Sequence, residues 1–245
     1  MIYSDSVPRT CLNMGSRATH LYFDLGDTLV DLRGLVPAMA GEVQARFPEL
    51  ATHGGRIAKA WVVNTTEATA RAQGIAFRPG LEIAGLALAE AFAEVGGRLR
   101  DDAAVALVQD AWRLYLGRAA LYSDVTEGLL RTLRSRMTVL GIITDSDTSM
   151  VTPLLDRFEL RDLFDVIVVS DSVGAYKPDP RIYRAALERA SGRPESSVFV
   201  SNSLVDLKGA AAVGMVAIWV RRTREFQRAL WTPAVGDLRE LPQIL

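Results

Sequence analysis

The sequence predicts an α/β fold, with a Rossmann-like core in which helices cover both faces of a parallel sheet. The expected arrangement has three layers, α/β/α, and an inserted all-helical cap domain. Short apolar, β-branched runs alternate with helical patterns, which is typical of parallel sheets. A long helical segment interrupts that alternation after the first run. The length of 245 residues suits one large domain or a core with one sizeable insertion.

Five apolar runs are expected to form the strands of the sheet. Each is almost continuously apolar instead of alternating with polar residues, and strands that are covered on both faces have this composition. The five runs are Thr19–Leu25, Thr138–Thr144, Val166–Ser170, Val198–Val200 and Val216–Val220.

Helices are expected between these strands. Asp179–Ala190 begins with a cap residue followed by proline, which is favoured at the first helical position. Asp206–Val213 precedes Gly214, and glycine is a common helix stop. The remaining helical patterns in the core are Glu127–Arg136 and Ser149–Leu160.

The segment from Leu32 to Gly117 is rich in Ala, Leu, Glu and Arg and contains no convincing strand. Helical spacing is clear in Ala84–Val95 and in Ala103–Leu116. One crossover between parallel strands needs far fewer residues, so the segment predicts an inserted helical cap. The expected boundaries are 1–17 for an N-terminal extension, 18–32 and 118–245 for the core, and 33–117 for the cap.

Composition excludes several classes of partner. The net charge of −1 argues against a nucleic-acid or anionic-membrane surface, because both need a strong positive field. The run Arg221–Arg224 is therefore expected to be a solvated helix start. No run reaches the about 18 continuous apolar residues of a membrane span. The single cysteine, Cys11, suits a reducing compartment, so we expect a cytoplasmic protein of undetermined oligomeric state.

Polar side chains follow the expected strands at the point where each one ends. In open parallel sheets, binding sites form outside the carboxyl ends of the strands. These residues should therefore meet at one edge of the sheet. In chain order they are Asp24, Thr144, Asp145, Ser146, Lys177, Asn202 and Asp206.

Their chemistry suits attack on a small anionic substrate. Asp24 would be the nucleophile. Thr144 and Lys177 would stabilise charge that develops on the transferred group. Asp24 and Asp206, with carbonyl oxygens, could hold Mg²⁺, which prefers oxygen ligands.

Four segments in order resemble the motifs of the haloacid dehalogenase-like (HAD) hydrolase superfamily, in the branch with a helical cap that includes phosphatases and dehalogenases. The segments are FDLGDTLVD, IITDS, GAYKPDPRIY and VFVSNSLVDLKGAAAVGM, and the C-terminal DLRELPQIL is also typical. The resemblance runs from about residue 19 to the end of the chain.

The resemblance implies a role for each matching residue. Asp24 would be esterified transiently, Lys177 would neutralise it, and Thr28 would orient the first loop. The implied catalytic residues are Asp24, Thr144 and Lys177. The implied substrate-binding residues are Thr28, Asp145, Ser146 and Asn202. The implied magnesium ligands are Asp24, the backbone carbonyl of Gly26, Asn202 and Asp206.

Two positions depart from the family's pattern. Gly26 stands where phosphatases carry a second aspartate, a general acid that is typically worth about 10²–10⁴-fold in rate. Asp27 follows one residue later, and its side chain is expected to point elsewhere. Asn202 stands where a metal-binding aspartate is usual, so Mg²⁺ should bind more weakly.

Three hypotheses remain open. The favoured one is a magnesium-dependent phosphatase for a small phosphorylated metabolite, with weakened acid catalysis, because the spacing from Asn202 to Asp206 fits the phosphatase pattern. The second is a metal-independent 2-haloacid dehalogenase, because halide leaves without a proton. Such enzymes use a cap arginine beside a tryptophan, however, and none follows Trp61; Arg71 and Arg78 are expected to be surface residues instead. The third is a catalytically impaired binding protein.

Overall fold

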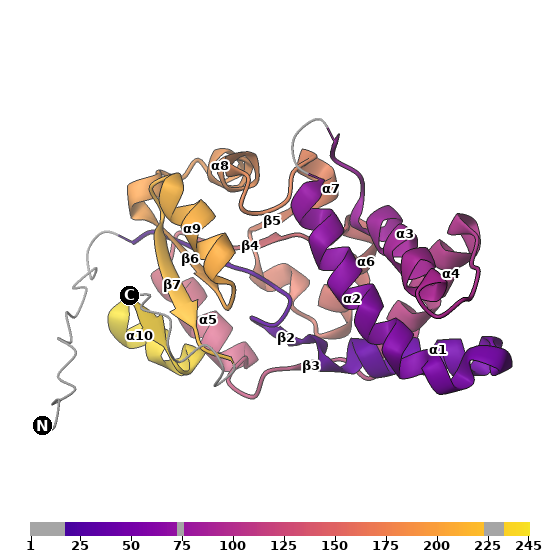
Figure 1. Cartoon of the computed structure of the whole chain (residues 1–245). Coiled ribbons are helices and arrows are strands. Elements are labelled where there is room, and N and C mark those ends of the chain that lie inside the picture. Colours follow the sequence, from indigo (N-terminus) through magenta and orange to yellow (C-terminus); the bar gives the residue numbers. More distant parts are fainter. Residues whose placement is uncertain (1–17, 73–75, 223–232) are drawn as a thin grey trace, which may run out of the picture.

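The structure is a computed structural model that describes residues 18–72, 76–222 and 233–245. It contains a parallel sheet with helices on both faces and a separate group of helices at one side (Figure 1). The expected α/β core with a helical cap is confirmed. The proposed extension 1–17, Cys11 within it, and Thr223–Arg224 of the arginine run lie outside the described residues.

The central sheet has six strands in the order β5-β4-β1-β6-β7-β8, and every neighbouring pair is parallel. In β1, His20 pairs with Val139 on one side and with Ser197 on the other, so the first strand lies inside the sheet. Five strands match the predicted runs closely, whereas the two-residue β8 is too short to give a pattern. The strands are β1 His20–Phe23, β4 Val139–Thr144, β5 Val166–Val169, β6 Ser197–Ser201, β7 Val216–Val220 and β8 Ala234–Val235.

Helices cover both faces of this sheet. Leu21 and Phe23 face one hydrophobic core, and Tyr22 between them faces the other, because successive strand residues point to opposite faces. This is why the strands are apolar almost continuously. The first core includes α5 Glu127–Arg136, α6 Thr148–Arg157 and α10 Leu241–Ile244, and the second includes α8 Pro180–Arg189 and α9 Leu204–Ala212.

In the described part of the chain, the cap has four α-helices that pack around a third hydrophobic core. The sequence indicated α3 and α4 but not α1 and α2. Gly41 lies in α1, and α2 carries the β-branched pair Val62 and Val63, all of which weaken helix propensity. Packing between helices overrides that weakness. The cap helices are α1 Leu35–Arg46, α2 Gly54–Arg71, α3 Gly80–Ala93 and α4 Asp101–Leu116.

A short antiparallel ribbon joins the cap to the core. It consists of β2 Val30–Asp31 and β3 Ala120–Leu121, where the chain leaves the core and returns to it. The domain boundaries at 18–32, 33–117 and 118–245 remain a proposal. The shorter elements are α7 Ser170–Val173 and the 3₁₀ turns Leu32–Gly34, Pro48–His53, Arg161–Leu163, Pro194–Ser196 and Leu238–Glu240. Across the described residues, no helix is both long and apolar enough to cross a membrane.

Arg222 contradicts the prediction of a solvated arginine run. Its guanidinium is buried and forms two hydrogen bonds with the Asp124 carboxylate, at 2.7 and 2.8 Å. It also donates from Nε to the Thr28 carbonyl at 3.0 Å and lies 4.1 Å from the centre of the Tyr122 ring. The sequence showed the positive charge but not the distant carboxylate that accompanies it. Arg222 therefore ties the segment after β7 to the loop that follows β1.

We expect Gly141→Ala in β4 to destabilise the core by about 1–3 kcal/mol, the usual effect of overpacking. A Cβ atom at Gly141 would lie 2.6 Å from the Tyr22 ring and 3.0 Å from the Val166 carbonyl oxygen. Urea denaturation measures the change. The control is Gly128→Ala in α5, where a Cβ atom would meet nothing within 4 Å; it should stabilise the protein by up to about 1 kcal/mol. Equal stability of the two variants would contradict this packing.

Candidate active site

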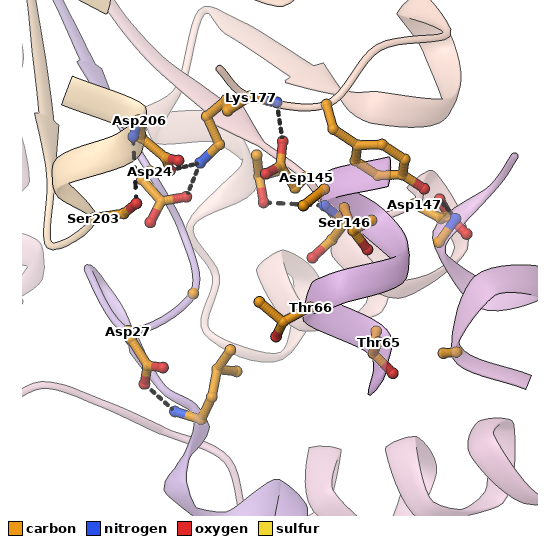
Figure 2. Close-up of a pocket in the computed structure, with 18 of the residues that line it drawn as sticks. Asp24, Asp27, Thr65, Thr66, Asp145, Ser146, Asp147, Lys177, Ser203 and Asp206 are labelled. Carbon is orange, nitrogen blue, oxygen red and sulfur yellow. Dashed lines mark hydrogen bonds and ion pairs between the residues drawn. The ribbon is translucent and has the colours of Figure 1, made fainter. Parts of the chain in front are cut away.

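The Lys177 ammonium lies between two carboxylates at the edge of the sheet (Figure 2). Its Nζ atom is 2.5 Å from Oδ1 of Asp24 and 2.7 Å from Oδ2 of Asp206. All three side chains are buried. Asp24 follows β1, Lys177 follows the short helix after β5, and Asp206 lies in the first turn of α9. The fold therefore brings three distant segments to one charged cluster.

Two contacts position Lys177. Its backbone N–H donates to Oδ1 of Asp145 at 2.7 Å, which joins its loop to the loop after β4. On the other side, Pro178 packs against Gly209 of α9, where an added Cβ atom would lie only 2.7 Å from the proline Cβ. A glycine in α9 thus permits the close approach that places Lys177 beside Asp206.

Thr28 fixes the orientation of the Asp24 carboxylate. Its hydroxyl donates to Oδ2 of Asp24 at 2.8 Å, and it accepts a hydrogen bond from the Asn202 backbone N–H at 3.1 Å. The residue is completely buried and does not line the cavity described below. This placement suits a residue that positions Asp24. We therefore propose that Thr28 orients the nucleophile and does not touch the substrate, although the resemblance implied substrate binding.

A cavity of about 890 Å³ lies at the carboxyl ends of the strands, between core and cap. The other predicted site residues all line it. On the core side these are Asp24, Gly26, Thr144, Asp145, Ser146, Lys177, Asn202 and Asp206. On the cap side, α2 contributes Trp61, Thr65, Thr66 and Thr69, and α4 contributes Val108 and Trp112.

Within the described residues, an apolar side chain takes the place of the acid that is absent at Gly26. A Cβ atom at this position would lie 2.7 Å from Cδ1 of Leu32, so the leucine side chain occupies the space. Asp27 points away from Asp24, as expected (Figure 2). Its Oδ1 accepts a hydrogen bond from the Leu32 backbone N–H at 3.1 Å and lies 3.5 Å from the Tyr122 hydroxyl.

Sequence reasoning missed the contact between Asp147 and the cap. The two Asp147 carboxylate oxygens accept hydrogen bonds from the backbone N–H groups of Gly80 and Leu81, at 2.8 and 2.7 Å. These groups lie at the N-terminus of α3, where an acidic side chain is favourable. Nearby, the Tyr176 hydroxyl donates to the Arg78 carbonyl at 2.7 Å. The only sequence signal was a second aspartate after β4, which is also common in turns.

Burial and charge shift the pKa values of this cluster. Burial alone would lower the pKa of Lys177, but the carboxylates of Asp206, Asp24 and Asp145 raise it well above its ordinary value. Burial raises the pKa of Asp24, the Lys177 ammonium opposes that rise, and the Asp206 charge adds to it. Burial likewise raises the pKa of Asp145 to about 7, although Lys177 opposes the rise. Lys177 is therefore an ammonium at neutral pH.

The available donors match Mg²⁺ in kind. Asp24, Asp206, the Asn202 side chain and the Gly26 carbonyl all offer oxygen, which hard cations prefer. Within the described part of the chain, however, no group of three or more His, Cys, Asp or Glu side chains is arranged to hold a metal ion. A magnesium site here would consist of two carboxylates and neutral oxygens, so the ligands would carry little negative charge.

The fold and the site define a hydrolase with an aspartate at the end of the first strand of its sheet. The family model for haloacid dehalogenase-like hydrolases matches residues 19–214, and the chain belongs to this family. The predicted resemblance is therefore confirmed.

Its relatives include both dehalogenases and phosphatases. The chain is 31% identical over 127 residues to (S)-2-haloacid dehalogenase 1 of a Pseudomonas species. The aligned region covers 51% of this chain and 56% of that protein. It is 30% identical over 198 residues to the phosphoglycolate phosphatase of Pseudomonas putida. This aligned region covers 80% of this chain and 66% of that protein. The chain thus spans roughly half to two thirds of the length of these curated relatives.

A solved structure has the same fold. The L-2-haloacid dehalogenase from Xanthobacter autotrophicus matches with a TM-score of 0.73 at 20% identity, over 93% of this chain and 98% of that one. At this level of identity the match shows the fold alone.

The pKa of Asp145 predicts a pH effect on turnover. We expect kcat/KM for an anionic substrate to fall by up to about tenfold per pH unit above about 7, because a deprotonated Asp145 adds negative charge beside Lys177. A pH profile of Asp145→Asn should lack this fall. The control is Asp171→Asn, which alters an exposed carboxylate bonded to Thr148 and should keep it. A fall that persists in Asp145→Asn would assign it to another group.

Proposed function

We propose that this chain is a magnesium-dependent phosphatase for a small phosphorylated metabolite, with Asp24 as the nucleophile. The observation that carries the proposal is the buried ammonium of Lys177 between Asp24 and Asp206, at the wall of a cavity. A cationic group beside the attacking carboxylate would stabilise an incoming phosphoryl group. The low net charge argues against nucleic acid and membranes as partners, and the single cysteine suits a cytoplasmic location.

In this mechanism Asp24 attacks phosphorus and the ester P–O bond breaks, which leaves an aspartyl phosphate that water then hydrolyses. Thr28 and Lys177 hold one oxygen of Asp24 each, so the carboxylate has a fixed orientation before attack. Thr144 and Lys177 would bind the phosphoryl oxygens. Magnesium held by Asp24, the Gly26 carbonyl, Asn202 and Asp206 would supply further positive charge.

The glycine at position 26 limits which leaving groups depart readily. An alkoxide needs a proton from the enzyme, whereas a phenolate or an acyl group does not. With Leu32 in the space beside Gly26, that proton has no donor at the usual place. Aryl and acyl phosphates are therefore the favoured substrates.

A dehalogenase is the second candidate, because Gly26 and Asn202 would both be tolerated when halide is the leaving group. Two observations favour the phosphatase instead. Arg71 is 70% exposed and pairs with Glu67, and Arg78 is 56% exposed and pairs with Glu82. Neither arginine is among the residues that line the cavity, where a 2-haloacid would need a cation for its carboxylate. Loss of catalysis is the third candidate.

An activity panel separates the three candidates. We expect phosphate release from p-nitrophenyl phosphate that Mg²⁺ stimulates and a chelator suppresses, and that Asp24→Asn abolishes without unfolding the protein. The matched control Asp156→Asn changes an exposed carboxylate on α6 and should retain activity. Chloride release from 2-chloropropionate in excess chelator would support the dehalogenase. If the folded protein shows neither activity, the third candidate, a binding protein without catalysis, would be supported.

We also expect Asn202→Asp to lower the half-saturating Mg²⁺ concentration by about tenfold, because it adds a carboxylate to the proposed ligand set. Asp206→Asn should raise that concentration for the opposite reason. Calorimetric metal titration and the magnesium dependence of activity measure both effects. Unchanged metal affinity in both variants would show that these residues are not magnesium ligands.

A further inference from the structure

The cap wall of the cavity is neutral. The side chains that α2 and α4 contribute to it are tryptophan, threonine, alanine and valine. Figure 2 shows Thr66 extending from α2 toward the side of the cavity that holds Asp24 and Asp27. Thr65 and Thr66 donate their hydroxyl hydrogens to carbonyls of their own helix, at 2.7 and 2.9 Å. Their oxygens remain available to accept hydrogen bonds.

The core wall carries six carboxyl groups, of which Asp24 and Asp206 pair with Lys177 and Asp179 pairs with Arg181. Among the described residues that line the cavity, Lys177 is the only cationic side chain, and it already pairs with two carboxylates. A bound phosphoryl group would interact with this ammonium and leave no other cation in the described lining. A second negative group elsewhere on the substrate would face carboxylates or neutral side chains, with no further cation among the described lining residues to stabilise it. The acidic residues of the lining are Asp24, Asp27, Asp145, Asp147, Asp179 and Asp206.

The cavity is also large and partly aromatic. Its volume of about 890 Å³ lies within the range of sites for ring-sized organic molecules. The Trp61 indole N–H donates to the Ala84 carbonyl at 3.0 Å, but the buried Trp112 indole N–H has no partner among the described residues. Buried indole N–H groups normally have an acceptor. The Trp112 nitrogen is itself buried, so what this wall offers a ligand is aromatic and apolar surface together with the threonine hydroxyls, which fits a neutral organic group.

We propose that the non-reacting part of the substrate is uncharged and largely apolar, of aryl or alkyl type, and that it lies against α2 and α4 of the cap. This inference rests on the proposed phosphatase function and narrows it. Phosphate esters that carry a carboxylate, and those with a second phosphate, would be poor substrates. An ester whose organic part bears only hydroxyl or amide groups would be a good one.

Two esters of nearly equal size test the proposal. We expect kcat/KM for 4-carbamoylphenyl phosphate to exceed that for 4-carboxyphenyl phosphate by at least about tenfold, mainly through KM, because the two differ in one negative charge. Equal rates, or a preference for the carboxylate, would overturn the inference and leave the phosphatase intact. No hydrolysis of either ester would overturn the phosphatase itself, and this inference with it.

A charge placed on α2 tests where the organic group lies. Thr66→Arg, or Thr69→Arg as a second variant, should shift the preference toward the carboxylate ester by at least about tenfold. The matched control is Val63→Arg on the same helix, which is 55% exposed and does not line the cavity; it should leave the preference unchanged. An unchanged preference in folded Thr66→Arg and Thr69→Arg would overturn the placement against α2.

Discussion

The ion pairs of Lys177 are the constraint on which the rest of the site depends. Removing an ammonium from water has a penalty of several kcal/mol, which only well-placed partners can offset. Asp24 and Asp206 are those partners, and each comes from a different segment of the core. Because β1 lies between β4 and β6, the segments that follow these strands meet at one edge. The architecture of the sheet and the chemistry of the cluster therefore stabilise each other.

Sequence reasoning succeeded where local pattern and function coincide. Continuous apolar runs fixed the strands, and the polar residues that follow them proved to line one cavity, Thr28 excepted. It failed where the decisive partner is distant. The contact between Arg222 and Asp124 joins residues 98 positions apart, and no periodicity signals it. Helices α1 and α2 were missed for a related reason, because packing within the cap outweighs their weak propensity.

The core of the site is compatible with more than one reaction. An aspartate held by Thr28 and Lys177 can attack phosphorus or carbon, and both kinds of hydrolase occur among the relatives. The distinction must come from the surroundings, namely the charge beside the nucleophile and the wall that receives the rest of the substrate. Here the cap supplies hydroxyl and indole groups, and its two candidate arginines form ion pairs at the surface.

The contact between Asp147 and α3 has a consequence for motion. The short loop after β4 carries Asp145, which faces the cavity, and Asp147, whose carboxylate also accepts hydrogen bonds from the N-terminus of α3. A ligand that rearranges this loop would alter the strength of cap docking, and by thermodynamic reciprocity docking would alter ligand affinity equally. Ligand binding in the cavity and closure of the cap over the core would then be coupled through this one loop.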